Sequence, residues 1–189
     1  MTSSQPRRIC SGARFRARSP TTMGAPSSVR NRGSRRSSKA RPIWADTLAR
    51  LGELPQFNGS AVAMGFCYGG PYAILGPKRL GYAGGISCHG TQMLDYLHEL
   101  EDVCEPVCIL WGDRDHRAPE DVLSAYRALA SRKNNVELHI FPGVQHGYMM
   151  QGMPKAYDAR ACEFSMLRAV AIVDGFRSSN VQKAIREAS

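Results

Sequence analysis

The sequence predicts an α/β protein with a parallel β-sheet of about four strands joined by crossover helices. Two observations support this fold class. Short apolar runs, of the length expected for strands buried on both faces, alternate with longer segments of helical periodicity. A glycine-rich turn also joins the first apolar run directly to a helical segment, as in a βα unit.

Strands and helices are expected to alternate from residue 43 onward. The expected strands cover residues 60–66, 84–88, 106–111 and 136–141. The expected helices cover residues 43–54, a short segment from Tyr72, residues 93–100, residues 119–133, and a last helix from near Pro154. That last helix is expected to bury one apolar face, formed by Cys162, Met166, Ala169, Val173 and Phe176.

The first 42 residues differ in composition from the rest of the chain. They carry ten Arg, one Lys and no acidic residue, which leaves 25 − 11 = 14 basic and 16 acidic residues for positions 43–189, a net charge of −2. So much like charge with so little apolar surface predicts disorder. We therefore expect a disordered tail at 1–42, a domain at 43–178 and a C-terminal tail at 179–189.

Three interpretations of residues 1–42 stay open. An Arg- and Ser-rich segment without acidic residues is typical of an organelle transit peptide. An Arg-rich arm can also bind nucleic acid, but this one has a single aromatic residue, Phe15, and the domain has no basic excess, which disfavours that function. The interpretation we favour is a region translated in the wrong frame.

The remaining composition points to a domain in a reducing compartment. No run of about 18 apolar residues is present, so we expect no membrane-spanning helix. The six cysteines include no Cys-x-x-Cys pair and no zinc-ligand spacing, so no metal site is expected. We expect these cysteines to be reduced thiols and the protein to be cytoplasmic, with an organelle as the alternative if the tail is a transit peptide.

The sharpest local motif is the turn after the first expected strand, Gly65-Phe66-Cys67-Tyr68-Gly69-Gly70. It matches the Gly-x-nucleophile-x-Gly elbow, in which a nucleophile on a tight, strained turn needs small neighbours at Gly65, Gly69 and Gly70. Cys67 takes the place of the nucleophile. The backbone amide of Tyr68, at the start of the following helix, could donate a hydrogen bond to an oxyanion.

The acid and the base are expected at the ends of later strands. Asp115 follows the strand at 106–111, and His146 follows the strand at 136–141. The carboxyl ends of parallel strands meet at one edge of the sheet, so Cys67, Asp115 and His146 are expected to come together there as a catalytic triad. Asp113 is the competing acid, although it could instead organise the turn.

These three blocks resemble the signature blocks of the dienelactone hydrolases. The resemblance covers about residues 43–178 and implies an α/β-hydrolase fold that lacks its first strands and helices. It also implies hydrolysis of a small-molecule ester or lactone by a Cys–His–Asp triad, with no metal or organic cofactor. By matching motif, Cys67 would attack the carbonyl, His146 would move protons and Asp115 would orient the imidazole.

Two departures from the family pattern limit this expectation. The part expected ahead of residue 43 normally supplies a second oxyanion amide and substrate-binding groups. In addition, Met150 stands where the family carries an arginine that contacts the substrate carboxylate, so an unspecified ester, lactone or thioester is the better expectation. The alternatives are a catalytically impaired remnant of such an enzyme and a nucleic-acid-binding protein. An incomplete sheet would expose an edge strand through which the chain could self-associate.

Overall fold

The computed structural model describes residues 34–187 and contains a four-stranded parallel sheet in the order β1-β2-β3-β4. The strands are β1 (Val62–Phe66), β2 (Gly84–Cys88), β3 (Val107–Arg114) and β4 (Val136–Gln145). The helices are α1 (Ser34–Gly52), η1 (Cys67–Gly69), α2 (Gly70–Leu80), η2 (Met93–Tyr96), α3 (Leu97–Leu100), α4 (Glu120–Arg132) and α5 (Ala159–Glu187). The expected parallel sheet with crossover helices is confirmed.

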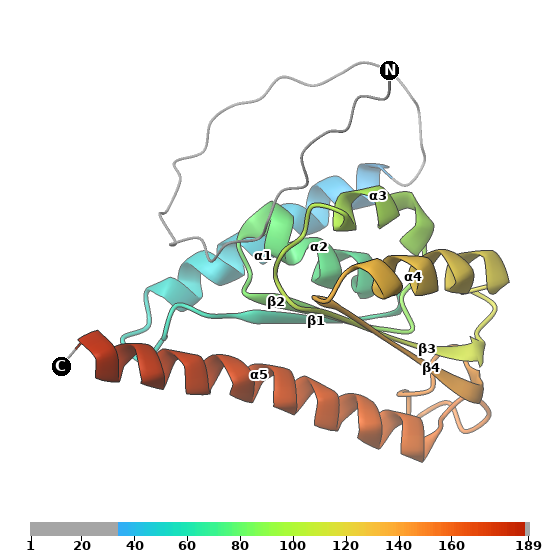
Figure 1. Ribbon diagram of the computed structural model, residues 1–189. Helices are drawn as coiled ribbons and strands as arrows, with labels where there is room; N and C mark the ends of the chain where they lie inside the picture. Colours follow the sequence, from blue (N-terminus) through green and yellow to red (C-terminus); the bar gives the residue numbers. More distant parts are fainter. Residues whose placement is uncertain (1–33, 188–189) are drawn as a thin grey trace, which may run out of the picture.

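The helices cover the sheet on both faces, as a parallel sheet requires. Helices α1 to α4 lie on one side and α5 lies alone on the other (Figure 1). Neighbouring strands pair in simple succession, with Val62 opposite Gly84, Gly85 opposite Val107 and Val107 opposite Val136. All four strands therefore end at the same edge, and β1 and β4 form the two sides of the described sheet.

Each face of the sheet has its own core. The larger cluster packs β3 against α2 and α4 and includes Trp111 and Tyr126, whose rings meet edge to face with centroids 5.0 Å apart. Both polar tips are satisfied, because Trp111 Nε1 donates to the carbonyl of Gly90 at 3.0 Å and the Tyr126 hydroxyl donates to that of Met93 at 2.9 Å. These two bonds tie the loop after β2 to β3 and α4.

The first helix begins earlier than expected. α1 starts at Ser34 rather than at residue 43, so residues 34–42 of the predicted tail are helical. Arg, Lys and Ala favour helix, and each further residue adds a hydrogen bond once the helix around Trp44 has nucleated. The prediction of disorder for residues 1–33 lies outside the described residues.

The last helix differs from the expectation at both ends and in its buried face. It begins at Ala159 rather than near Pro154, because the side chain of Asp158 accepts a hydrogen bond from the amide of Ala161 at 2.9 Å and caps it. It continues to Glu187, so residues 179–187 extend the helix instead of forming a separate tail. Of the five expected buried positions, Met166 and Val173 are exposed.

The buried face of α5 is formed mainly by small residues. Ala161, Ser165 and Ala169 are buried at intervals of four residues, and this spacing points to one face of a helix. Ser165 is satisfied there, because its hydroxyl bonds the carbonyl of Ala161 and the hydroxyl of Tyr148, each at 2.7 Å. Small side chains let α5 approach the sheet closely, which a pattern of large apolar residues alone does not reveal.

The cysteines fall into two classes. Cys67, Cys88, Cys108 and Cys162 are free thiols, as expected. Cys104 is disulfide-bonded, so the expectation of reduced thiols is wrong at this position. Cys104 lies exposed in the loop after α3, where a sulfur atom is accessible for pairing.

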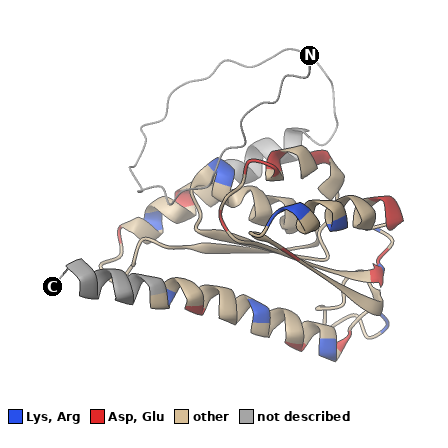
Figure 2. Cartoon of the chain, in the orientation of Figure 1, with Lys and Arg blue, Asp and Glu red and all other residues tan. Residues whose placement is uncertain are grey.

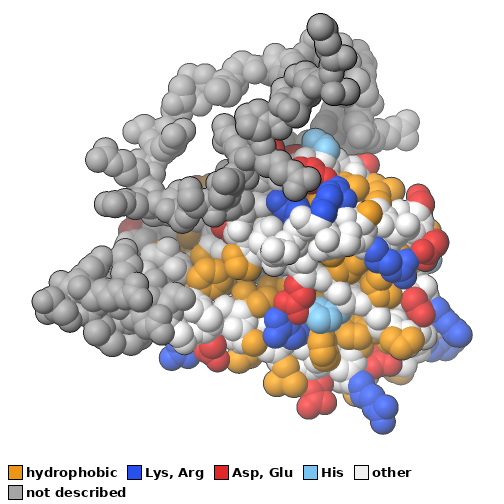
Figure 3. All heavy atoms as spheres, viewed as in Figure 1, with side chains coloured by type: hydrophobic (Ala, Val, Ile, Leu, Met, Phe, Trp, Pro, Cys, Tyr) orange, Lys and Arg blue, Asp and Glu red, His pale blue; other side chains and the backbone are white. Residues whose placement is uncertain are grey.

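The described surface carries both signs of charge. Lys and Arg alternate with Asp and Glu along α5, whereas α4 has its acidic residues in the first turn and its basic residues after them (Figure 2). Apolar side chains interrupt this polar surface (Figure 3). Among the exposed large apolar residues, Leu167 and Val170 belong to α5. Among the described helices, none combines the length and the apolar character needed to cross a bilayer.

Candidate active site

Cys67 lies at the carboxyl end of β1, where the chain turns into η1 and then α2. Its φ is 50°, a left-handed conformation that is costly for a residue with a side chain. The turn is held from outside by the amide of Thr91, which donates to the carbonyl of Cys67 at 3.1 Å. The strained turn expected from the glycine-rich motif is therefore present, and it puts Cys67 at the mouth of a cavity.

The three glycines around Cys67 do not have equal roles. A Cβ on Gly65 would lie 2.1 Å from the carbonyl oxygen of Gly69, and a Cβ on Gly70 would lie 2.6 Å from the Cα of Gly90. Both clashes involve backbone atoms, so neither position accepts a side chain without movement of the chain. A Cβ on Gly69 would have no other atom within 4 Å, so the turn does not require glycine there.

The structure brings Cys67, His146 and Asp115 together in hydrogen-bonding order. His146 Nε2 lies 3.2 Å from Cys67 Sγ, and His146 Nδ1 lies 3.0 and 2.9 Å from the two carboxylate oxygens of Asp115. Asp115 is 2% exposed and also accepts a hydrogen bond from the amide of Arg117 at 2.7 Å. With its Nδ1–H donating to Asp115, the imidazole presents the Nε2 lone pair to the thiol.

Asp113 serves the backbone and lies apart from the histidine. Its carboxylate accepts a hydrogen bond from the amide of Gly143 at 2.7 Å and so connects the ends of β3 and β4. This contact braces the β4 end that carries His146. Of the two candidate acids, Asp115 is thus the one that contacts the imidazole.

The other buried thiols are poor nucleophiles. Burial raises the pKa of both Cys88 and Cys108 to about 12, so they stay protonated at neutral pH. Cys162 lies on α5, outside the set of residues that lines the cavity at Cys67. Cys67 alone among the free thiols combines access to that cavity with a neighbouring base.

Two further histidines contact His146. The His89 ring lies with its centroid 5.0 Å from that of His146, and the His116 ring lies at 5.4 Å. Neither histidine belongs to the triad expected from the sequence. The signal that identifies His89 is its place directly after β2, because the same rule that located Asp115 and His146 applies to the end of that strand.

A cavity of about 1060 Å³ opens above the triad. It is lined by Cys67, Tyr68, Pro71, Tyr72, Thr91, Gln92, Tyr96, His116, Arg117 and His146. Arg117 gives the cavity a cationic group, whereas Met150 is 49% exposed and does not line it. The volume suits a small organic molecule with one polar end.

The chain resembles known hydrolases by sequence pattern and by fold. The family model of the dienelactone hydrolase family matches residues 16–176, which extends further toward the N-terminus than the resemblance over residues 43–178. A search of curated protein sequences finds no match.

Among solved structures, similarity of fold extends over most of this chain at low sequence identity. A Klebsiella pneumoniae protein assigned to the dienelactone hydrolases aligns with a TM-score of 0.53, 20% identity and 70% of this chain covered. A dienelactone hydrolase-like promiscuous phosphotriesterase from metagenomic libraries aligns with a TM-score of 0.54, 20% identity and 74% of this chain covered. An esterase from Pyrococcus furiosus aligns with a TM-score of 0.50, 16% identity and 73% of this chain covered. The alignments cover only 57%, 64% and 60% of these three chains, respectively.

Proposed function

Because the chain belongs to the dienelactone hydrolase family, we propose that it hydrolyses ester, lactone or thioester bonds through Cys67, His146 and Asp115. The observation that carries the proposal is the hydrogen-bonded order of these three side chains at the mouth of a cavity. A thiol, an imidazole and a carboxylate in this order are the parts needed for nucleophilic acyl transfer.

In the proposed reaction, Cys67 Sγ attacks the carbonyl carbon while His146 Nε2 accepts the thiol proton. The tetrahedral intermediate collapses to a thioester on Cys67, and His146 returns the proton to the departing alcohol oxygen. A water molecule, deprotonated by His146, then attacks the thioester and releases the acid and the free thiol. Asp115 holds the imidazole ring and stabilises its cationic form throughout.

The oxyanion that forms in both steps needs a hydrogen-bond donor. We assign this role to the backbone amide of Tyr68, which follows Cys67 on the turn that leads into α2. The N-terminus of that helix adds a favourable positive end. In the family fold a second donor comes from an earlier strand–helix loop.

The substrate we propose is a small-molecule ester, lactone or thioester, handled without a metal or organic cofactor. Arg117 and His116 favour a substrate with a partial or full negative charge facing the loop after β3. Met150 has no charge with which to pair the carboxylate of a dienelactone, so dienelactone itself is a less favourable substrate than another ester or lactone. The mechanism needs Cys67 as a free thiol, which a cytoplasm-like compartment favours, whereas the disulfide at Cys104 is unusual in such a compartment.

The test is turnover of p-nitrophenyl acetate by the purified chain, compared with its Cys67→Ala and Cys162→Ala variants. We expect Cys67→Ala to lower the rate about 100-fold or more, because it removes the nucleophile. Cys162→Ala removes a free thiol outside the cavity and should leave the rate unchanged.

The competing possibility is a catalytically impaired member of the family, in which the three side chains are present but do not turn over substrate. It predicts equal, background turnover by the parent chain and by Cys67→Ala. That result would contradict the proposed hydrolase activity of this chain.

A further inference from the structure

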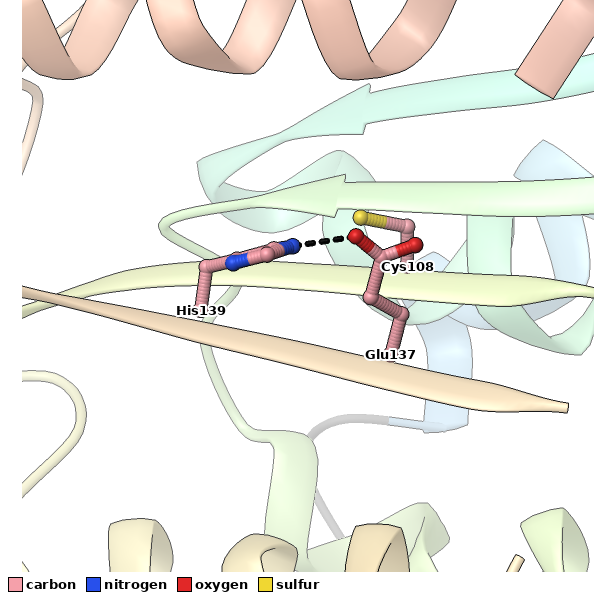
Figure 4. Close-up of side chains that lie close together, drawn as sticks. All are labelled: Cys108, Glu137 and His139. Atoms are coloured by element: carbon pink, nitrogen blue, oxygen red, sulfur yellow. Dashed lines mark hydrogen bonds and ion pairs between the residues drawn. The ribbon is translucent and has the colours of Figure 1, made fainter. Parts of the chain in front are cut away.

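Three side chains with metal-binding atoms gather on the face of the sheet that α5 covers. Cys108 on β3 and Glu137 on β4 are register partners, and His139 follows two residues later on the same face of β4. Figure 4 shows the three side chains converging, with a contact between His139 and Glu137. One donor atom from each lies within 4.8 Å of the others, and none of these residues lines the cavity at Cys67.

We propose that Cys108, Glu137 and His139 form a binding site for a divalent transition metal, with Zn²⁺ as the best match. A thiolate, an imidazole and a carboxylate are the three ligand types of zinc sites, whereas Mg²⁺ and Ca²⁺ select oxygen ligands. Tetrahedral bonds of about 2.0–2.3 Å put ligand atoms about 3.5 Å apart, so the donors have to close in by roughly 1 Å. Three protein ligands leave the fourth position to water.

The three side chains differ in how deeply they are buried, and the two that are partly exposed leave a route for a cation from solvent. Cys108 is fully buried, and within residues 43–178 no hydrogen bond reaches its sulfur atom. The side chains of His139 and Glu137 are 27% and 34% exposed, so a cation can enter from their side and meet Cys108 at the bottom. Coordination and loss of the thiol proton to solvent would occur together, because only the thiolate is a ligand.

Arg168 on α5 is the competitor for this site. Its Nε and Nη2 donate to the two oxygens of Glu137 at 2.8 and 2.6 Å. Oε1 of Glu137 also contacts His139 Nε2, and a bound metal would replace that contact, whereas among the described residues Oε2 is contacted by Arg168 alone and keeps a second lone pair. Glu137 can therefore bind a metal while Arg168 stays in contact, although the two positive charges repel. Without a metal, Arg168 and Glu137 would form only an ion pair that connects α5 to β4. A metal site and a simple ion pair can be told apart, because only the metal site binds a transition-metal ion.

The experiment is a Co²⁺ titration of the full chain, freed of metal by a chelator and kept free of oxygen, so that the free thiols stay reduced and the disulfide at Cys104 stays intact. It is done in the Cys67→Ala background, so that the thiol of the candidate triad cannot contribute. We expect one Co²⁺ per chain, with a thiolate-to-metal band in the near ultraviolet and the visible bands of four-coordinate cobalt. Added Zn²⁺ should displace the cobalt and raise the thermal unfolding midpoint.

Variants in that background identify the ligands. Cys108→Ser should abolish the near-ultraviolet band, and His139→Gln, at a partly exposed position that tolerates substitution, should weaken binding about tenfold or more. Arg168→Gln should tighten binding, because it removes the competing cation, and Cys162→Ser is the matched thiol control that should bind like its parent. Absence of the band in the parent, or its persistence in a folded Cys108→Ser variant, would overturn the proposal.

Discussion

His89 is a buried histidine whose ring nitrogens find no hydrogen-bond partner among the described residues. It is 1% exposed, and it packs against His146 and Tyr148 with ring centroids 5.0 and 5.3 Å away. Burial, reinforced by the neighbouring His146, lowers the pKa of His89 to about 4. The side chain is therefore neutral at the pH at which His146 would act as a base.

This burial makes stability depend on pH. Between pH 6.5 and 4 the unfolded chain binds a proton at His89 that the folded chain does not, so stability falls as pH falls through this window. The loss attributable to His89 should approach about 3 kcal/mol. Urea unfolding from pH 7 to 4 should show this loss in the parent and a smaller loss in His89→Phe. His98→Phe, at an exposed histidine, should keep the dependence of the parent, and an unchanged slope in His89→Phe would contradict the expectation.

Gly65 and Gly69 offer a matched test of the strained turn. Gly65→Ala pushes a methyl group to 2.1 Å from a backbone oxygen, so it should destabilise the chain by about 2 kcal/mol or more. Gly69→Ala meets open space at φ −74°, so it should change stability by less than about 1 kcal/mol. Urea unfolding of both variants checks this. Equal losses of stability would show that glycine is not required at position 65 because of its close approach to the backbone of Gly69.

At the scale of elements, α5 shows that a capping residue sets where a helix begins. Pro154 predicted an early start, but the chain makes turns until Asp158, whose side chain bonds the amide of Ala161 and whose carbonyl accepts from Cys162 at 3.0 Å. The apolar pattern of α5 does not by itself select which face packs on the sheet, because the buried residues are small. The residue at which the helix begins therefore helps to set which face is turned inward. The cap provides this starting point.

Removal of this cap should therefore cost stability. We expect Asp158→Ala to lower the free energy of unfolding by about 1 kcal/mol, the usual contribution of an N-cap aspartate. Asp174→Ala is the control on the same helix, because the Asp174 carboxylate forms an exposed ion pair with Arg177 at 3.4 Å and contacts no other side chain among the described residues, with an expected contribution below about 0.5 kcal/mol. Equal losses in chemical unfolding would argue against capping as the role of Asp158.

At the scale of the whole molecule, β1 carries the proposed nucleophile and also forms one side of the described sheet. It pairs only with β2 among the described strands, and Phe66 at its end is 45% exposed. A strand side that is open for pairing favours association with another chain. The candidate triad therefore lies beside one of the two open sides of the described sheet.

We expect the purified chain to self-associate through this side of β1. Phe66→Lys, which puts a charge at the end of β1, should lower the average mass in sedimentation velocity at a fixed concentration. Leu167→Lys, at a 63% exposed position on α5, removes a similar apolar side chain far from β1 in sequence and should leave the mass unchanged. The reverse result would assign the association to α5.

The sequence by itself determined the strand and helix order and the candidate triad. Buried strands have continuous apolar runs, and the carboxyl ends of parallel strands meet at one edge, so Cys67, Asp115 and His146 could be found from their positions after three such runs. The sequence already favoured Asp115 over Asp113, and the structure adds the physical reason, because the carboxylate of Asp115 contacts the imidazole of His146 whereas that of Asp113 bonds the amide of Gly143.

Only the tertiary structure decided which residues meet across elements. The face of α5 depends on packing of small residues, which carry a weak apolar signal. The contact of His89 with His146 depends on how the segments after β2 and β4 meet at the carboxyl end of the sheet, although β3 separates the two strands. The cluster of Cys108, Glu137 and His139 arises from the register of β3 and β4 and has no local spacing that resembles a metal motif. Contacts across strands depend on pairing register and pleat, and a one-residue shift in either strand would separate these side chains.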